Sequence, residues 1–187
     1  MTQYDELFSC QCCGECCRGD MRVYLNPDDL KRIAVFEGYK NTRQLFDDFL
    51  VVIDSERSSA PLPRLRFSKG SLGCCPYLEN TLDEEPGFLL KGYCRLHPDF
   101  KPLVCMLAPM YRTIDLEEDS ELWGFKTPLK DCPGCSVLTE EKSYYAPEGL
   151  STLLDSEKTF FKKIAGMLDS GCTNNEVIET LYYFDVK

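Results

Sequence analysis

The sequence places five of its twelve cysteines within eight positions, in the stretch Cys10-Gln11-Cys12-Cys13-Gly14-Glu15-Cys16-Cys17. Cys10, Cys13 and Cys16 lie three residues apart, so two C-x-x-C steps follow each other, and Cys17 comes directly after them. A C-x-x-C turn lets two sulfur atoms reach one ion from a single short loop, as in zinc and iron-sulfur sites. The glycine inside the second step allows the positive φ that such a tight turn often needs. This stretch therefore predicts a metal site.

The composition favours reduced thiols over disulfides. The chain has 187 residues, of which 43% are hydrophobic, so it can build a core without disulfides. Residues 1–7 are polar and acidic and lack the basic start and apolar run of a secretion signal. No apolar run approaches the roughly 20 residues of a membrane span. We therefore expect a cytoplasmic protein, in which thiols stay reduced and a cysteine cluster binds metal.

The charge of the chain limits its partners. It has 31 acidic and 21 basic residues, for a formal net charge of −10. Metal-bound thiolates would add further negative charge. Such a surface matches poorly with a phosphate backbone, whose binding depends on Lys and Arg. We therefore expect neither nucleic acid nor a membrane as a partner.

Two helices are expected after the cysteine stretch. Residues 22–25 alternate as in a short strand. Asn26 then fits an N-cap and Pro27 the first helical position, and Gly38 fits the end of this helix. A second helix is expected to begin near Thr42. Its apolar face would consist of Leu45, Phe46, Phe49 and Leu50.

The middle of the chain predicts loops and short strands. Residues 55–63 are polar and contain two prolines, which indicates a loop, and residues 64–67 alternate like a strand. Residues 79–87 are acidic and typical of turns. Residues 88–91 are expected to pair with the preceding strand region, which gives a hairpin with cysteines at both ends. Residues 123–126 predict another strand.

The last part of the chain is helical in pattern. Residues 149–168 have an apolar face at helical spacing, and Thr173 with Glu176 forms a capping box for a last helix. We expect an α+β fold: a small metal-stabilised, cysteine-rich domain with short strands and a C-terminal helical cap. Residues 1–148 would form the cysteine-cluster metal-binding domain, and residues 149–187 a helical extension packed on the same domain.

Several spaced motifs occur together in this chain. They are Phe8-Ser9-Cys10, Cys13-Gly14-Glu15-Cys16-Cys17-Arg18, Cys75-Pro76-Tyr77-Leu78, the stretch from Cys94 to Cys105 with Lys101-Pro102, and Cys132-Pro133-Gly134. In this order they resemble the cysteine-cluster family of zinc- or iron-chelating proteins, the YkgJ type, over residues 8–135. Asn26-Pro27-Asp28-Asp29-Leu30 is similar to the first helix of that family.

The resemblance implies eight metal ligands by position, which are Cys10, Cys13, Cys16, Cys17, Cys75, Cys94, Cys105 and Cys132. Four cysteines lie outside the pattern, namely Cys12, Cys74, Cys135 and Cys172. The sequence departs from many members at Lys101, where they have Arg, and at His97, where they have Tyr. Neither change removes a thiol.

The expected cofactor is an iron-sulfur cluster or zinc. Eight thiolates suit two sites of four cysteines, or one cluster and one zinc ion. Zinc in a closed shell of four cysteines adds folding free energy, whereas a four-cysteine cubane cluster can also transfer electrons. The family label and the repeated C-x-x-C spacing favour iron-sulfur by a small margin.

Two functions from different classes fit these observations. In the first, the protein uses its metal for a redox role or to modify a protein side chain, because a related cysteine pattern occurs in flagellin lysine N-methylases. In the alternative, it is a non-catalytic, zinc-stabilised module that binds another protein. The sequence contains no G-x-G-x-x-G loop, which argues against a redox or modifying enzyme that depends on a nucleotide cofactor. The sequence does not decide whether the protein is an enzyme.

For several other polar and sulfur-containing residues, the sequence allows two interpretations of their role. His97, the one histidine, could act as a ligand or base, although a local hydrogen-bonding or packing role explains it more simply. Four basic residues could neutralise thiolate charge or lie on the surface: Arg18, Arg95, Lys101 and Arg112. Met106 and Met110 are expected to pack rather than bind metal.

Overall fold

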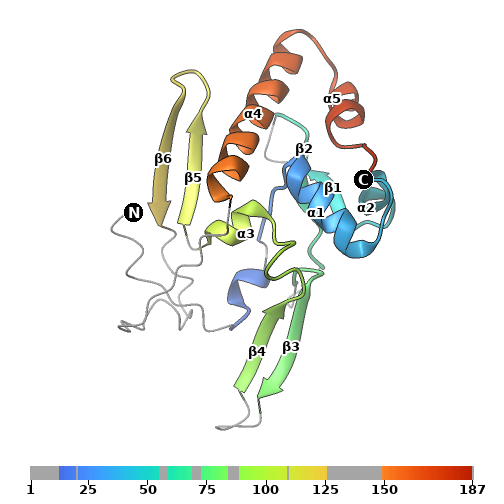
Figure 1. Cartoon of the computed structure of the whole chain (residues 1–187), viewed down its shortest axis with the longest axis vertical. Coiled ribbons are helices and arrows are strands. Elements are labelled where there is room, and N and C mark those ends of the chain that lie inside the picture. The colour runs from blue at the N-terminus through green and yellow to red at the C-terminus, as the bar shows by residue number, and fades with distance from the viewer. Residues whose placement is uncertain are drawn as a thin grey trace.

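The computed structural model of the protein describes residues 13–19, 21–54, 59–68, 73–83, 89–108, 110–125 and 149–186. Its first half contains η1 (Glu15–Cys17), α1 (Pro27–Glu37), α2 (Arg43–Asp47), β1 (Val51–Asp54), β2 (Leu62–Leu65), β3 (Leu78–Asp83) and β4 (Leu89–Cys94). Its second half contains α3 (Leu103–Leu107), β5 (Met110–Asp115), β6 (Ser120–Phe125), α4 (Leu150–Asp169) and α5 (Asn174–Leu181). Figure 1 shows α1, α2, α4 and α5 gathered at one end, while the β3–β4 hairpin extends from the other end.

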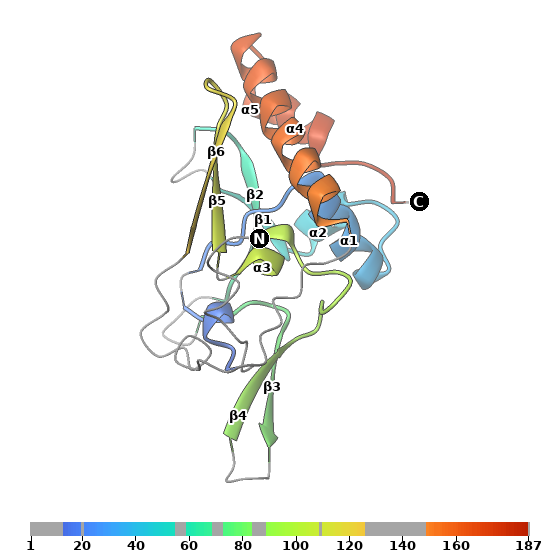
Figure 2. The ribbon, with the colours of Figure 1, turned by 60° about the vertical axis from the view of Figure 1, so that its left-hand side comes forward.

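The strands form three separate antiparallel pairs, β1–β2, β3–β4 and β5–β6. In the first pair Val51 lies opposite Leu65, and both are buried. The β3–β4 hairpin projects away from the helices, whereas the β5–β6 hairpin lies beside α4 (Figures 1 and 2). The expectation of a fold that mixes helices with short strands and ends in a helical segment is therefore confirmed.

Helix α1 begins and ends where the sequence indicates. The Asp29 N–H donates to Asn26 Oδ1 at 2.9 Å, and the Asn26 N–H donates to Asp29 Oδ2 at 3.1 Å, so the two residues form a capping box. Pro27 occupies the first turn, and Gly38 ends the helix with a φ of 73°. The predicted helix is confirmed. Its buried face includes Leu30, Ile33 and Ala34.

Helix α2 is shorter than predicted. It ends at Asp47, and the chain then turns through Phe49, which has a φ of 57° and is 63% exposed. Residues 51–54 form β1, a strand that was not predicted. Their β-branched side chains favour a strand over a continued helix. Residues 22–25 form no strand; Tyr24 makes a single bridge to Arg64.

The hairpins differ from the sequence-based prediction in extent. Residues 79–83 were expected in a turn-rich segment, but they belong to β3 and pair with β4 as far as Asp83 opposite Leu89. Residues 62–63 were placed in a loop and belong to β2. The third hairpin contains β5, which was not predicted, and extends the predicted 123–126 strand back to Ser120. Each of these segments forms a strand that pairs with a partner strand.

The two C-terminal helices pack on the same core as α1. Helix α4 was predicted over 149–168 and is confirmed, as is the capping box, in which Glu176 Oε2 accepts from the Thr173 N–H at 2.7 Å. The Phe160 ring of α4 lies 6.0 Å from the ring of Tyr182. The Tyr182 hydroxyl donates to the Pro61 carbonyl at 2.8 Å, which links the end of the chain to the segment before β2.

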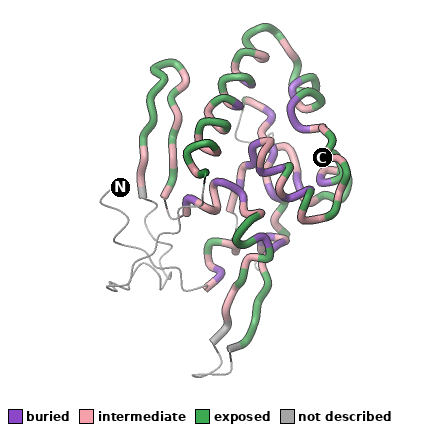
Figure 3. Tube along the Cα trace, viewed as in Figure 1, coloured by how far each residue is buried: buried purple, intermediate pink, exposed green. Residues whose placement is uncertain are grey.

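One hydrophobic core joins these elements. Figure 3 shows buried residues where α1, α3 and the inner ends of the strands meet, and exposed residues along the hairpins. The fully buried side chains include Leu30, Ile33, Leu45, Leu65, Tyr77, Leu96, Leu103, Val177 and Tyr182. Cys75 belongs to this core, and Cys17, Cys94 and Cys105 pack against it. Among the described helices, none is long and apolar enough to cross a membrane.

Candidate metal centre

The cysteine turn is a short 3₁₀ helix. Gly14 precedes it with a φ of 74°, and the Cys17 N–H donates to the Gly14 carbonyl at 2.9 Å. The positive φ is the conformation for which the glycine was expected. In Figure 2 this turn lies beside the inner end of the β3–β4 hairpin. Gly14 and Gly92 of β4 approach so closely that a Cβ on residue 92 would lie 2.6 Å from the Gly14 Cα.

Backbone hydrogen bonds hold the segment before β3 against this turn. The Gly19 N–H donates to the Gly73 carbonyl at 2.7 Å, and Arg18 and Cys74 form an antiparallel bridge. The Cys75 N–H donates to the Cys17 carbonyl at 2.8 Å. These bonds bring Cys75 next to the cysteine turn, although about sixty residues separate them in the chain.

The hairpin and α3 supply two further thiols. Cys94 ends β4 opposite Leu78, and the following residue Arg95 donates its N–H to the Tyr77 carbonyl at 3.0 Å. The end of β4 therefore lies beside the turn that contains Cys75. Cys105 lies in the middle of α3, and its N–H donates to the Pro102 carbonyl at 2.9 Å.

Four thiols influence one another electrostatically, those of Cys16, Cys75, Cys94 and Cys105. Burial is the main cause that raises the pKa of Cys75 to about 11, and the nearby Cys94, Cys74 and Cys16 contribute to the rise. Burial also raises the pKa of Cys105, with additional contributions from Cys75, Cys94 and Cys16. Cys16 likewise adds to the raised pKa of the buried Cys94. An effect of one thiol on the pKa of another links every pair within this set, which we call the thiol tetrad, and Cys75 and Cys105 likewise add to the raised pKa of Cys17.

Backbone N–H groups surround two of the tetrad sulfurs. The Tyr77 N–H bonds the Cys75 side chain and lowers its pKa against the effect of burial. The N–H groups of Leu96 and His97 do the same for Cys94. Donors two and three residues after a cysteine favour its thiolate, and hydrogen bonds to sulfur tune thiolate-bound metals. In both turns these backbone donors partly offset the effect of burial, which still leaves the pKa of each thiol raised.

Cys16 and Cys17 interact with each other. Their sulfurs lie 3.9 Å apart. The hydrogen bond from Cys17 lowers the pKa of Cys16 to about 6, and the same bond raises the pKa of Cys17. Cys16 is exposed and Cys17 half-buried. Of these two thiols, Cys16 therefore ionises more readily, which suits a metal ligand.

Lys101 is the basic residue that faces the thiols. Its ammonium group lowers the pKa of Cys16 and opposes the effect of burial on the pKa values of Cys94 and Cys105. The prediction that Lys101 lies close enough to offset thiolate charge agrees with this placement.

The other three predicted basic residues have different contacts. Arg18 pairs with Glu15 at 2.9 Å and donates to Asn80, whereas Arg95 lies over the Phe36 ring at 5.5 Å. Arg112 has a side chain only 3% exposed and bonds Glu121, at 2.7 Å, and Glu157. The suggestion that Arg112 offsets thiolate charge is therefore wrong, because its acidic neighbours already engage it.

The structure places the eight predicted ligands unequally. Cys16, Cys75, Cys94 and Cys105 form the tetrad, Cys17 lies beside it, and Cys13 lies in the same turn, while Cys10 and Cys132 fall outside the described residues. Within the described part of the chain, no three His, Cys, Asp or Glu side chains lie close enough to hold a metal ion. The donor chemistry nevertheless fits a thiophilic metal: four thiols, backbone donors to sulfur and one ammonium group.

The cysteines outside the predicted ligand set have separate environments. The Cys74 sulfur lies 3.5 Å from the Ser68 hydroxyl, and the Cys74 N–H donates to the same hydroxyl. Cys172 lies between α4 and α5 with its sulfur 4.0 Å from the Ser170 hydroxyl. Cys12 and Cys135 fall outside the described residues.

His97 is exposed at the edge of the site. Burial and the nearby Lys101 ammonium both lower its pKa, which favours the neutral imidazole. The contact that it makes with the tetrad is through its backbone N–H to Cys94. This agrees with the local hydrogen-bonding role.

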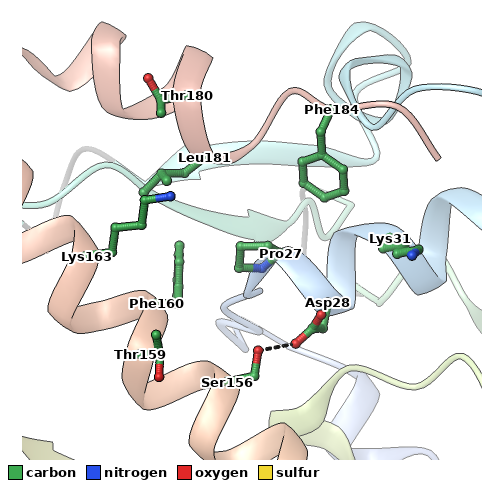
Figure 4. Close-up of a pocket in the computed structure, with 10 residues that line it drawn as sticks. All are labelled: Pro27, Asp28, Lys31, Ser156, Thr159, Phe160, Lys163, Thr180, Leu181 and Phe184. Atoms are coloured by element: carbon green, nitrogen blue, oxygen red, sulfur yellow. Dashed lines mark hydrogen bonds between the residues drawn. The ribbon is translucent and has the colours of Figure 1, made fainter. Parts of the chain in front are cut away.

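A pocket of about 380 Å³ lies between α1, α4 and α5, apart from the thiols (Figure 4). Its floor contains Phe160, Leu181 and Phe184, and Lys31 and Lys163 lie at its rim. The described residues that line it include no cysteine. The pocket is therefore a feature separate from the thiol tetrad.

Sequence reasoning missed two residues that build the site. Gly92 lies inside a strand, where a glycine often marks a close backbone approach, and this signal could have been used. The sequence indicated Asp29 only as part of the Asn26–Leu30 motif at the start of the first helix. Its contact with α3 joins residues 74 positions apart, and no local pattern indicates it.

Comparison with protein-family models, with curated proteins and with solved structures gave no match for this chain.

Proposed function

We propose that the protein binds a metal centre through cysteine thiolates, with Cys16, Cys75, Cys94 and Cys105 as its four ligands. The observation that supports this proposal is the convergence of four thiols from four separate segments: η1, the turn before β3, the end of β4, and α3. Reduced thiols that only filled space would not need backbone donors aimed at their sulfurs. Four thiolates are a complete ligand set for zinc or for a cubane cluster.

Binding would draw the tetrad together. The thiols lie at the border of the core, on short elements that are joined by few backbone bonds. Metal binding is commonly coupled to folding, because ligands must lose protons and adopt a common centre. Lys101 supports this step, since its ammonium group favours the thiolate forms of Cys16, Cys94 and Cys105.

The remaining predicted ligands would serve the same region. Cys13 and Cys17 belong to the turn that carries Cys16. The proposal assigns them to a second site together with Cys10 and Cys132, which fall outside the described residues. The resemblance to the cysteine-cluster family supports this set of eight ligands, because the motifs that contain these cysteines occur in the same order as in that family.

An iron-sulfur cluster is favoured over zinc. The repeated C-x-x-C spacing and the hydrogen bonds to sulfur support it, since such bonds tune the potential of clusters. A bound cluster would supply electron transfer, and zinc would instead supply folding free energy. The same proposal includes a cytoplasmic location, where thiols stay reduced. It also includes another protein as the partner.

The test is the metal and sulfide content of the protein purified without oxygen, together with its visible absorption spectrum. Iron with acid-labile sulfide and a brown colour supports an iron-sulfur centre. Zinc alone, with no visible absorption, supports a structural site and the protein-binding alternative. Protein that contains neither metal, and that takes up neither after anaerobic reconstitution with iron and sulfide or with zinc, contradicts the proposal.

A further inference from the structure

Asp29 is a charged residue in the hydrophobic core. It is 1% exposed and lies in the first turn of α1. Its carboxylate accepts from the Asn26 N–H, from the Arg32 guanidinium and from the Leu103 N–H. Burial raises its pKa to about 6, while Arg32 and the two backbone donors oppose the rise. At neutral pH it is therefore an anion with three donors.

The two carboxylate oxygens of Asp29 accept hydrogen bonds from different segments of the chain. Oδ2 accepts from the Asn26 N–H at 3.1 Å and completes the capping box of α1. Oδ1 accepts from the Leu103 N–H at 2.8 Å, across to α3. The capping box alone would not require the second contact.

The contact to Leu103 substitutes for a missing cap. Helix α3 begins at Leu103 after Pro102, which makes no side-chain capping bond. The first N–H groups of a helix have no partner inside it and need one from outside. Asp29 supplies that partner to the first residue of α3, two positions before Cys105.

We infer that Asp29 is a positioning residue for Cys105, because it fixes the start of the short helix that carries this thiol into the tetrad. This inference rests on the proposed function, in which Cys105 is a metal ligand. It explains how a ligand on a five-residue helix is held toward the other three ligands. The α1 helix, anchored in the core, thereby sets the place of a thiol at the edge of the core. Ligand groups generally need such supporting contacts to keep their geometry.

The first experiment uses metal-free protein, so that it does not depend on the proposed function. The rate of iodoacetamide alkylation is measured by mass spectrometry at Cys105, with Cys172 as the internal reference. Asp29→Ala should raise the Cys105 rate at least about fivefold relative to Cys172, because α3 loses its anchor. Asp29→Asn keeps an oxygen for the Leu103 N–H and should stay within about twofold of wild type.

A matched control separates the anchor from the helix cap. Asn26→Ala removes the capping side chain of α1 but leaves the Asp29 contact with Leu103 in place. It should destabilise the protein, because the Asp29 N–H loses its capping partner. It should leave the relative Cys105 rate unchanged. An equal rise in Asn26→Ala and Asp29→Ala would show general loosening and overturn the inference.

A second measurement needs no variant and remains valid if Asp29→Ala does not fold. The Leu103 amide of metal-free wild-type protein should exchange with deuterium slowly, although it belongs to the first turn of a helix. Fast exchange at Leu103, comparable to an exposed amide, would overturn the inference.

Metal content then connects the inference to the proposed function. Asp29→Ala should weaken zinc binding about tenfold or more, measured by competition with a chromophoric chelator, whereas Asn26→Ala should bind as wild type does. Wild-type affinity in Asp29→Ala would overturn the role of Asp29. If wild type itself bound no metal while Cys105 became more reactive in Asp29→Ala, the anchoring would hold and the proposed function would be contradicted.

Discussion

Gly14 and Gly92 pack backbone against backbone, with the Gly92 position so tight that an added Cβ would lie 2.6 Å from the Gly14 Cα. Gly14 belongs to the cysteine turn, and Gly92 lies two residues before Cys94. This contact therefore joins the segment that carries Cys16 to the strand that carries Cys94. The absence of two side chains, rather than an attractive contact, lets the two thiols approach.

Substitution of Gly92 by alanine should separate the cysteine turn from the hairpin. The new methyl group would clash with the Gly14 backbone and the Leu78 side chain. A shift of the Gly14 backbone would cost free energy, because the hydrogen bond from the Cys17 N–H holds it in place. We expect a loss of about 1–3 kcal/mol in the free energy of unfolding. We also expect bound metal to fall to half or less of the wild-type value. Urea unfolding and metal analysis of the same preparations would measure both.

Gly166→Ala is the matched control for this substitution. Gly166 lies in α4, and a Cβ there would meet no atom within 4 Å. Because glycine is unfavourable inside a helix, this variant should be more stable by about 0.5–1 kcal/mol. Its metal content should not change. Equal metal loss in the two variants would contradict the role given to the Gly14–Gly92 contact.

Substitution of Arg112 should lower the stability of the protein and leave its metal content unchanged. Its buried guanidinium bonds Glu121 and Glu157 and donates to the Leu154 carbonyl at 2.8 Å, which ties the β5–β6 hairpin to α4. Arg112→Met should leave the Glu157 carboxylate without its arginine partner, whereas Glu121 keeps Lys158 at 3.4 Å, and should cost about 3 kcal/mol in thermal or urea unfolding. The folded fraction should keep its wild-type metal content. A folded Arg112→Met protein that has lost its metal would show that Arg112 acts on the thiols.

Lys162→Met provides the comparison for an exposed pair. Lys162 pairs with Asp119, and both side chains are about half exposed. Such pairs contribute between 0 and roughly 1 kcal/mol. This variant should therefore unfold close to the wild type, and a loss as large as that of Arg112→Met would contradict the distinction between the buried and the exposed pair.

Glu157 should make stability depend on pH. Burial raises its pKa from 4.5 to about 7, and the nearby Asp29 adds to the rise while Arg112 opposes it. A pKa that is higher in the folded state favours the protonated form there, so this contribution is present below pH 4.5 and is lost as the pH rises through 7.

Glu157→Gln removes this titration and provides the measurement. Between pH 4.5 and 7 the free energy of unfolding of wild type should fall relative to the variant, by on the order of 3 kcal/mol. Urea unfolding of the two metal-free proteins at several pH values would show the trend. A constant difference, or one that grows in favour of wild type as the pH rises, would contradict the environment described for Glu157.

Local signals in the sequence predict the helices well. Asn26 with Pro27, and Thr173 with Glu176, mark helix starts by hydrogen bonds within three residues, so α1 and α5 begin where they were expected. The long apolar period of residues 149–168 identifies α4 in the same way. Each of these signals lies within a single continuous segment of the chain and needs no distant partner.

The strands and the grouping of thiols depend on distant partners. Residues 79–82 are exposed, and residues 79–83 form a strand because β4 pairs with them. The family resemblance implied a ligand set but did not indicate which cysteines lie together. That grouping follows from contacts such as the Cys75 N–H to the Cys17 carbonyl, between residues 58 positions apart in the chain.

The most direct test of the thiol tetrad compares two neighbouring cysteines. Cys75 is buried with the tetrad, whereas the Cys74 sulfur lies against the Ser68 hydroxyl. Metal per chain, measured after anaerobic purification and reconstitution, should fall by half or more in Cys75→Ser and stay at the wild-type value in Cys74→Ser. Equal metal content in wild type, Cys75→Ser and Cys74→Ser would contradict the assignment of the tetrad as the metal site.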